Sequence, residues 1–257
     1  MTILLFDVDG TLCDSGRKIS KRMSFMLNKL MNKLDKNNKN ILIGIVGGGT
    51  YEKILYQLDN QIKPTYIFSE CGSVYHKLNS ISNKYDLLHK NELRNEKYYD
   101  KINLLVKTCL KYISNLNCMV TGHFIDLRHG LVYVSLIGMN ATCDERNAFI
   151  EEDNKHNYRL KLINILRAQS TQLEINDYLD ICVGGKVGIA IYPKKWNKVQ
   201  VLDLLNMKEK DNIHYFGDQY MPNGNDYELL TNKNIIPHIV DNPIQTLYKL
   251  YQLYKTI

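Results

Sequence analysis

Near its start the chain reads Ile3-Leu4-Leu5-Phe6-Asp7-Val8-Asp9-Gly10-Thr11-Leu12, an apolar run that ends in two aspartates. Residues 3–6 are apolar, contain no proline and predict a buried central strand. A strand buried on both faces is apolar throughout, so carboxylates at its end are expected only where the sheet opens into a crevice. The chemistry of the protein is therefore expected at Asp7 and Asp9.

Two carboxylates this close repel each other unless a cation or a shared proton compensates for their charge. Mg²⁺ is a hard ion that prefers oxygen ligands of this kind. With its carboxylate ionised, Asp7 is suited to attack a phosphorus atom, while Asp9 exchanges a proton with the departing or entering oxygen. Gly10 allows a turn that a side chain would obstruct. The structural alternative is an aspartate-rich turn that only ends a strand.

Strand and helix patterns alternate at both ends of the chain. Apolar runs predict strands at 41–46, 66–68, 213–216 and 235–240, and helical spacing predicts helices at 19–34, 51–58, 196–205 and from Pro243 onward. Alternation of strand and helix implies a parallel sheet with right-handed crossovers. The predicted core is therefore an α/β domain of the Rossmann-like type.

The pattern changes near residue 80, where an α+β segment interrupts the core. It contains predicted helices at 91–116 and 142–167, the second opened by a capping box of Thr142 and Glu145. Two predicted hairpins turn at 128–130 and 184–185. These elements predict a core at 1–82, an inserted α+β unit, the cap, at 83–193, and a return to the core at 194–257.

Three predicted strand ends carry polar groups that suit a phosphate. Asp7 and Asp9 follow the first strand, the glycine turn 47–50 the second, and Asp218 a later one. At the carboxyl edge of one parallel sheet they would form a phosphate site with a metal ion. Backbone N–H groups of the turn would bind phosphate oxygens. Lys198 would neutralise the attacking carboxylate and the phosphoryl oxygens.

Each of these features also has an ordinary structural explanation. A glycine turn after a strand often serves tight packing, a single lysine such as Lys198 is usually solvated, and an aspartate such as Asp218 often closes an Asx turn. The turn matches neither G-x-G-x-x-G nor G-K-[ST], so a dinucleotide fold and a P-loop are rejected. The order of the features along the chain favours the functional explanation.

Composition is that of an ordinary globular protein. The chain has 257 residues, 44% of them hydrophobic and 23% charged, and 33 Lys and Arg against 27 Asp and Glu give a net charge of +6. This mild charge suits a small anionic substrate, and without a dense basic block no nucleic-acid partner is expected. No apolar stretch approaches the ~20 residues that span a bilayer, so no membrane partner is expected. Six scattered cysteines without a C-x-x-C pair suggest reduced thiols in a cytoplasm.

These motifs resemble those of the haloacid dehalogenase-like phosphotransferases and, more narrowly, those of the eukaryotic-type phosphomannomutase family. The resemblance runs nearly end to end. The matching motifs, in chain order, are Asp7-Val8-Asp9-Gly10-Thr11, Ile45-Val46-Gly47-Gly48, Phe124-Ile125-Asp126-Leu127-Arg128-His129-Gly130, Val134-Ser135-Leu136-Ile137-Gly138, Asp144-Glu145-Arg146, Val183-Gly184-Gly185, Tyr192-Pro193, Trp196-Asn197-Lys198, Phe216-Gly217-Asp218 and Met221-Pro222-Asn223-Gly224-Asn225-Asp226.

The resemblance implies interconversion of mannose 6-phosphate and mannose 1-phosphate, feeding GDP-mannose synthesis, with Mg²⁺ as cofactor and a homodimer formed through the cap. By resemblance, a hexose bisphosphate activator phosphorylates Asp7, and Asp9 acts as acid and base. The implied metal ligands are Asp7, Asp9 and Asp218, with Asn225 and Asp226 supporting them or binding an additional metal ion. The implied substrate-binding positions are Arg17, Gly48, Gly49, Thr50, Arg128, Arg146, Gly188 and Ala190, of which Arg128 and Arg146 would hold the phosphate that is not being transferred.

Departures from the family gather in the substrate pocket. A phosphate-binding arginine of the family falls on Met139, a serine and an aspartate that contact sugar hydroxyls fall on Gly188 and Ala190, an arginine of the core loop falls on Gly16, beside Arg17, and a hydroxyl falls on Gly49, beside Thr50. Loss of one charged hydrogen bond typically costs about 1.5–3 kcal/mol. Two alternatives therefore stay open: a Mg²⁺-dependent sugar-phosphate phosphatase of the same fold, and a non-catalytic homologue.

Overall fold

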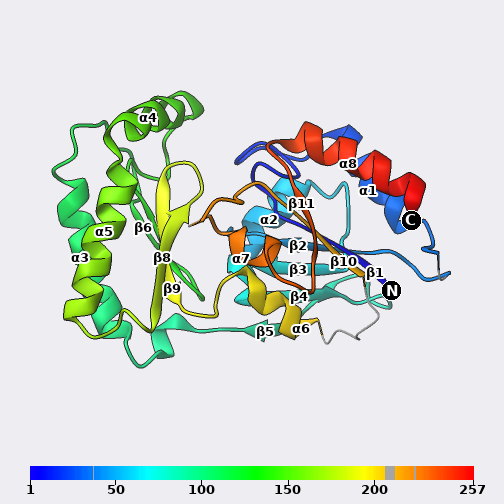
Figure 1. Ribbon diagram of the computed structural model, residues 1–257, viewed down its shortest axis with the longest axis horizontal. Helices are drawn as coiled ribbons and strands as arrows, with labels where there is room; N and C mark the ends of the chain where they lie inside the picture. The colour runs from blue at the N-terminus through cyan, green and yellow to red at the C-terminus, as the bar shows by residue number, and fades with distance from the viewer. Residues whose placement is uncertain (37, 206–211, 223) are drawn as a thin grey trace. The chain divides into compact units, whose positions relative to one another are not determined.

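The computed structural model describes residues 1–36, 38–205, 212–222 and 224–257. The chain forms two compact units (Figure 1). The core unit comprises Met1–Lys90 and Trp196–Ile257, and the cap unit comprises Asn91–Lys195. The predicted α/β class, with an α+β unit inserted into a core of parallel strands, is confirmed. Among the described residues, no helix has both the length and the apolar character needed to cross a bilayer.

The described residues of the core unit form a seven-stranded sheet in the order β11-β10-β1-β2-β3-β4-β5. The first five strands in this order are parallel, and β4 and β5 extend the sheet antiparallel. The strands are β1 (Thr2–Phe6), β2 (Leu42–Val46), β3 (Tyr66–Ser69), β4 (Val74–Leu78), β5 (Tyr85–Lys90), β10 (Asn212–Gly217) and β11 (Ile236–Ile239). Because β5 pairs with β4, the first boundary lies after residue 90, where the sequence predicted 82, and the second lies after residue 195, where it predicted 193.

Helices cover both faces of the core sheet (Figure 1). One face is covered by α1 (Lys21–Met31), α2 (Tyr51–Leu58) and α8 (Pro243–Thr256), and the other by the 3₁₀ turn η3 (Lys198–Gln200), α6 (Val201–Leu204) and α7 (Tyr227–Leu230). All of β1 is buried, which fits its apolar sequence. The predicted helix at 196–205 is shorter in the structure and begins as the 3₁₀ turn that carries Lys198.

The cap unit, all of which the structure describes, has a four-stranded antiparallel sheet in the order β6-β7-β9-β8. Its elements are the 3₁₀ turn η2 (Leu93–Asn95), α3 (Tyr99–Ile113), β6 (Ile125–Leu127), β7 (Val132–Ser135), α4 (Cys143–His156), α5 (Tyr158–Gln172), β8 (Leu179–Gly184) and β9 (Gly188–Pro193). Both predicted hairpin turns lie where the sequence placed them. The Thr142–Glu145 capping box is also present.

The prediction of one continuous helix over 142–167 was wrong. Asn157 adopts the left-handed conformation, with φ of 55°, and separates α4 from α5. Asn tolerates this conformation better than most residues. The corner is fixed by Asp153, whose carboxylate accepts from both the backbone N–H and the Nε of Arg159, at 2.9 and 2.6 Å.

Candidate active site

Two aspartates lie at the carboxyl ends of neighbouring parallel strands. Phe6 of β1 is in register with Phe216 of β10, and Asp7 and Asp218 follow these strands at the same edge of the sheet. Asp226, at the start of α7, completes a cluster of carboxylates. One oxygen from each of the three aspartates lies within 4.8 Å of the others. The core unit therefore gathers three carboxylates where the sequence predicted a phosphate and metal site.

Lys198 lies inside this cluster with its side chain fully buried. Its ammonium group pairs with Asp7 and with Asp226, the latter at 2.6 Å. Asp226 also accepts hydrogen bonds from the Tyr215 hydroxyl and, at 3.0 Å, from the backbone N–H of Gln219. Both Asp226 oxygens thus serve to hold the lysine and the loop. Asp226 therefore fixes the position of the Lys198 ammonium group that faces Asp7.

Burial and charge shift the ionisation of these groups strongly. Burial raises the pKa of Asp7, and the carboxylates of Asp226 and Asp218 raise it further, which together outweigh Lys198. Burial lowers the pKa of Lys198, but Asp226 and Asp7 outweigh burial, so the pKa lies well above its ordinary value. The lysine is therefore charged at any physiological pH. Its single positive charge does not balance the carboxylates of Asp7, Asp218 and Asp226 around it.

Asp9 occupies a different environment from Asp7. Its Oδ2 accepts from Lys53 Nζ at 2.6 Å, and its Oδ1 accepts from Gln57 Nε2 and from the Gly16 backbone N–H, both at 2.8 Å. Burial raises the pKa of Asp9, but Lys53, the Gly16 N–H and Gln57 outweigh burial, so the pKa is lowered. Asp9 is thus a carboxylate at neutral pH. The sequence grouped its side chain with the metal ligands, whereas the structure turns it toward α2 and gathers Asp226 with Asp7 and Asp218.

The donor set of the cluster fits a divalent cation such as Mg²⁺. Two buried oxygens, Asp218 Oδ1 and Asn225 Oδ1, have no hydrogen-bond partner among the residues that the structure describes. Buried polar atoms are normally paired, and hard oxygen donors are those that Mg²⁺ prefers. Burial and the nearby Asp226 carboxylate raise the pKa of Asp218 to about 6, which is the effect expected where a cation is needed to balance the charge. Asp7, Asp218 and Asn225 are the residues that would hold the ion; Asn223 of the same motif lies outside the described residues.

With Mg²⁺ bound to these residues, its effect on stability would depend on pH. Because its folded-state pKa exceeds the ordinary value of 3.8, Asp218 stabilises the metal-free fold at low pH, and that stabilisation is lost as pH rises through about 6. Mg²⁺ needs the ionised carboxylate, so it should stabilise the protein more at pH 7.5 than at pH 5. At a Mg²⁺ concentration of 100 times Kd the gain is about 2.7 kcal/mol. Thermal unfolding with and without Mg²⁺ at both pH values measures it.

Asp218→Asn is the matched variant for this experiment. It removes the charge and keeps the shape of the side chain, so the metal-free protein should lose its pH dependence at about pH 6 and the Mg²⁺ stabilisation together. An unchanged stabilisation by Mg²⁺ in Asp218→Asn would place the cation elsewhere.

Glycines let the backbone approach these carboxylates closely. Gly10 has φ of +91°, and a Cβ added there would lie 2.5 Å from Asp218 Oδ2. A Cβ added at Gly217 would lie 2.8 Å from Asp226 Cγ. Any side chain at either position would displace a carboxylate of the cluster. The glycine of the D-x-D-G-T motif is therefore required by contact with another strand end as well as by its φ.

The glycine turn after β2 is anchored by the segment that follows β3. Gly47 N–H donates to Phe68 O at 3.0 Å, Cys71 N–H donates to Gly47 O and Glu70 N–H donates to Gly49 O, both at 2.9 Å. Gly48 lies beside Asn225, since a Cβ there would be 3.6 Å from Asn225 Nδ2. The turn therefore adjoins the predicted metal ligands.

Thr50 caps α2 by accepting from the Lys53 N–H at 3.3 Å. Its hydroxyl proton can still be donated to an anion. A Cβ at Gly49 would lie 2.9 Å from Lys53 Cδ, so a hydroxyl-bearing side chain there would displace the lysine that holds Asp9. Arg17 is exposed, and its neighbour Gly16 supplies the N–H that binds Asp9.

The two cap arginines are held within the cap unit. Arg128, just after β6, donates its Nε–H to Asp126 at 2.6 Å. Arg146, on α4, donates to the carbonyls of Ala141 and Met139 at 2.9 and 2.7 Å. Gly188 and Ala190 lie on β9, where Gly188 pairs with Ser135, and Ala190 pairs with both Tyr133 and Cys182. These four positions are structured, but two of them carry no polar side chain.

Sequence reasoning missed several residues of the site. Lys53 and Gln57 lie four residues apart on α2 and both bind Asp9. This i, i+4 spacing places them on one face of a predicted helix that starts at the glycine turn, which is the signal that could have found them. Tyr215 was predicted only as part of an apolar strand, and no sequence signal identified it as a partner of Asp226.

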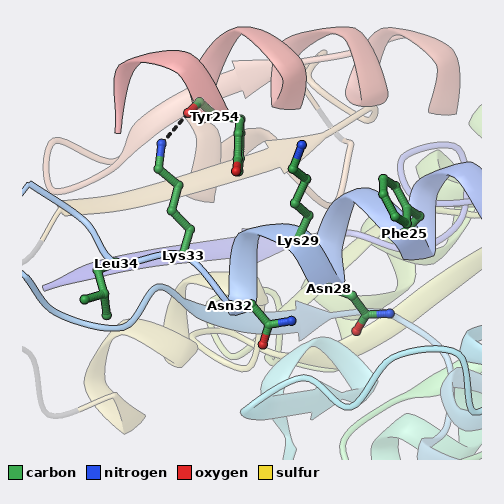
Figure 2. Close-up of a pocket in the computed structure, with 7 residues that line it drawn as sticks. All are labelled: Phe25, Asn28, Lys29, Asn32, Lys33, Leu34 and Tyr254. Atoms are coloured by element: carbon green, nitrogen blue, oxygen red, sulfur yellow. Dashed lines mark hydrogen bonds between the residues drawn. The ribbon is translucent and has the colours of Figure 1, made fainter.

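A hollow of about 570 Å³ lies between α1 and the end of α8 (Figure 2). The residues that line it are Phe25, Asn28, Lys29, Asn32, Lys33, Leu34 and Tyr254. The ammonium groups of Lys29 and Lys33 lie 4.6 and 4.3 Å from the centre of the Tyr254 ring, and Lys33 also donates to the Tyr254 carbonyl. These contacts hold α8 against α1, so the hollow is explained by the packing of the two helices. None of the site carboxylates lines it.

Several known proteins are similar in sequence to nearly the whole of this chain. The chain is 34% identical to phosphomannomutase 1 of Mus musculus, a match that covers 98% of this chain and 92% of the relative. It is 34% identical to a phosphomannomutase of Saccharomyces cerevisiae, covering 98% and 94%, and 31% identical to one of Encephalitozoon cuniculi, covering 100% and 94%.

Solved structures support the fold. An IMP-bound mutant of Plasmodium falciparum IMP-nucleotidase has a TM-score of 0.69 at 18% identity, covering 98% of this chain and 68% of that one. The C-terminal domain of Candida albicans trehalose-6-phosphate phosphatase has a TM-score of 0.61 at 17% identity, covering 100% and 92%. The family model described as eukaryotic phosphomannomutase matches residues 29–256. Together with the full-length relatives, this match shows that the chain belongs to the eukaryotic phosphomannomutase family.

Proposed function

We propose that this chain is a phosphomannomutase that interconverts mannose 6-phosphate and mannose 1-phosphate through an aspartyl phosphate on Asp7. The observation that carries the proposal is the buried contact of Lys198 with Asp7 and Asp226 at the end of the central strands, in a chain whose full-length relatives bear that name. A buried ammonium group beside a carboxylate suits attack on a phosphate, because it neutralises charge that gathers on both partners.

In the first half-reaction the Asp7 carboxylate attacks a phosphorus of a hexose bisphosphate activator. The new O–P bond forms as the P–O bond to the sugar breaks, and Asp9 in its protonated form gives its proton to the departing sugar oxygen. In the second half-reaction a sugar hydroxyl attacks the aspartyl phosphate, and Asp9 takes the hydroxyl proton. The lowered pKa of Asp9 makes the base form dominant in the free protein.

Bound Mg²⁺ would supply positive charge for the phosphoryl oxygens and for Asp7. The core supplies further donors of its own. The Gly48–Gly49 backbone, the Thr50 hydroxyl and the start of α2 are suited to bind phosphate oxygens. On the cap, a guanidinium grips phosphate with paired hydrogen bonds, so Arg128 and Arg146 suit the phosphate that is not transferred.

The setting of this activity is also a proposal. Mannose 1-phosphate made by the enzyme would feed GDP-mannose synthesis in the cytoplasm. We propose a homodimer formed through the cap, which is supported by exposed apolar side chains on two cap helices: Leu104 and Leu110 of α3, and Leu160 and Ile165 of α5. Light scattering would measure the oligomeric state of the purified protein and of a variant that carries both Leu160→Lys and Ile165→Lys. A monomeric unmodified protein would overturn this proposal.

The test of the activity is a phosphorus NMR time course with Mg²⁺, mannose 1-phosphate and a catalytic amount of glucose 1,6-bisphosphate. Mannose 6-phosphate is the expected product. Free phosphate without isomerised sugar would instead identify a phosphatase. No turnover of any hexose phosphate would identify a non-catalytic homologue.

Asp9→Asn should slow phosphoryl transfer by about 10²–10⁴-fold, the usual contribution of a general acid or base. The amide keeps the size of the side chain but neither accepts nor gives the proton. Single-turnover decay of the aspartyl phosphate on addition of mannose 1-phosphate measures the effect. An unchanged rate would assign proton transfer to another group.

Lys53→Met is the companion variant, because it leaves Asp9 in place. Loss of the ammonium group 2.6 Å away should raise the pKa of Asp9. The base form would then be lost at a higher pH, so the acidic limb of the pH–rate profile should move upward. A profile that does not move would show that Asp9 is not the group that titrates.

A further inference from the structure

Three consecutive residues after β3 adopt the left-handed backbone conformation. They form the segment η1 (Glu70–Gly72), in which φ is 51° at Glu70, 60° at Cys71 and 93° at Gly72. Glycine adopts this conformation readily, but other residues adopt it at a cost and keep it only where their surroundings hold them. All three residues are buried. The hydrogen bonds that η1 makes with its neighbours therefore maintain its conformation.

On one side, η1 holds the glycine turn that is suited to bind phosphate. Its first two N–H groups donate to the carbonyls of Gly49 and Gly47, both at 2.9 Å. A Cβ added to Gly48 would lie 3.8 Å from Cys71 Sγ. The position of the turn thus depends on the conformation of η1.

On its other side, η1 contacts the 3₁₀ turn η3, which carries Lys198. Gln200 is the last residue of η3, and its Nε2 donates to the Cys71 carbonyl at 2.9 Å and to Ser73 Oγ at 3.4 Å. The backbones approach closely here, since a Cβ added to Gly72 would lie 2.9 Å from Gln200 Cγ. The amide of Gln200 therefore joins η3 to η1.

The start of η3 has a separate support. Asn197, which caps η3, donates from its amide to Glu228 of α7. Asp226, which pairs with Lys198, lies at the beginning of the same helix. Lys198 is therefore held from two sides. The contact with α7 fixes it relative to Asp226, and the contact of Gln200 with η1 fixes it relative to the glycine turn.

We propose that Gln200 is a positioning residue for phosphoryl transfer, which fixes the Lys198 ammonium group relative to the glycine turn through its hydrogen bond to the Cys71 carbonyl. The inference rests on the proposed function and deepens it, because it names the residue that aligns two parts of the same site. The ammonium group and the turn would contact one phosphoryl group, so a change in their spacing weakens one set of contacts. A displacement of about 1 Å in such a site can cost about 10²-fold in rate.

Gln200→Leu tests the inference, because leucine keeps much of the side-chain volume but donates no hydrogen bond. Without that bond the left-handed backbone of η1 can relax, and the glycine turn should shift relative to Lys198. We expect transfer of phosphate from glucose 1,6-bisphosphate to Asp7 to be about 10-fold slower in a single turnover. For mannose 1-phosphate, kcat should fall by the same factor while KM stays within about twofold, which is the pattern of a contact that matters in the transition state.

Beryllium fluoride provides a readout that needs no turnover. In the presence of Mg²⁺ it binds to an aspartate carboxylate and mimics the phosphoryl group of an aspartyl phosphate, so an adduct on Asp7 would contact Lys198 and the glycine turn. We expect its affinity to be about 10-fold weaker in Gln200→Leu. The fluorine NMR signals of the adduct should also shift, because the hydrogen-bond donors around the fluorines have moved.

Gln252→Leu is the matched control, since it makes the same substitution at an exposed glutamine of α8. It should leave the transfer rate, the KM and the affinity for beryllium fluoride unaltered. If the unmodified protein is phosphorylated, an unchanged transfer rate in Gln200→Leu would overturn the inference. A loss of thermal stability with that unchanged rate would show that Gln200 has only a structural role.

The beryllium fluoride adduct also separates failure of the inference from failure of the proposed function. If the unmodified protein forms the adduct but converts no hexose phosphate, the proposed activity fails. The inference still stands in that case if Gln200→Leu binds beryllium fluoride more weakly by the expected factor, and falls if the two affinities are equal. If the unmodified protein forms no adduct and no aspartyl phosphate, both are overturned.

Discussion

Asp7→Asn is expected to abolish the aspartyl phosphate and to reduce turnover by on the order of 10⁴-fold or more, as loss of a catalytic nucleophile does in other enzymes. The amide is nearly isosteric, but its nitrogen and oxygen are not nucleophilic toward phosphorus. The fold should be preserved, because the substitution removes one of several buried negative charges that repel each other. Intact-mass spectrometry of protein quenched in acid after addition of glucose 1,6-bisphosphate measures the phosphoenzyme directly.

Asp14→Asn provides the control for this experiment. Asp14 is an exposed carboxylate in the same loop and lies outside the carboxylate cluster. It should keep both the phosphoenzyme and the turnover. A phosphorylated and active Asp7→Asn protein would show that another residue is the nucleophile.

Lys198→Met is expected to damage stability and activity together. Methionine retains most of the side-chain volume but leaves the carboxylates of Asp7 and Asp226 buried without their cation. Breaking a buried ion pair from one side typically costs about 3–5 kcal/mol. Loss of the fixed charge should also slow phosphoryl transfer by about 10²–10³-fold. Urea unfolding of the metal-free protein and single-turnover kinetics measure the two effects.

The pH dependence of stability and a second mutation test whether the unpaired carboxylates cause the loss of stability in Lys198→Met. Without the ammonium group the carboxylates can be neutralised only by protons, so the loss of stability should be larger at pH 8 than at pH 5. In the double variant Lys198→Met, Asp226→Asn, one unpaired charge is removed, and about 1–3 kcal/mol of the loss should return. A strictly additive double variant would show that Lys198 and Asp226 are not energetically coupled.

Much of the core was predictable because its strands are buried on both faces. Residues 3–6 and 213–216 are continuous apolar runs, and this is what a central parallel strand requires. The β4–β5 hairpin was missed because β5 is largely exposed and its Tyr85–Lys90 sequence has no regular alternation. The break at Asn157 was missed because a single residue in the left-handed conformation leaves the helical spacing on both sides intact.

The site was predictable as a set of strand ends but not as a set of contacts. Asp7, Lys198 and Asp218 come together because the parallel topology brings their segments to one edge. The direction of the Asp9 side chain depends on Lys53 and Gln57, which lie on a helix that was predicted without any contact to Asp9. Likewise, the role of Asp226 as the anchor of Lys198 depends on a Tyr215 hydroxyl in an otherwise apolar strand.

The central position of β1 has a consequence for the newly made chain. β1 pairs with β2 on one side and with β10 on the other, and β10 begins at residue 212. At about 5–20 residues per second, a ribosome needs roughly 10–40 seconds to reach β10 after completing β1. During that interval the N-terminal third exposes an unpaired strand edge, and Asp7 lacks its partner Lys198. The contiguous cap sequence, Asn91–Lys195, is complete before then and is free to fold first.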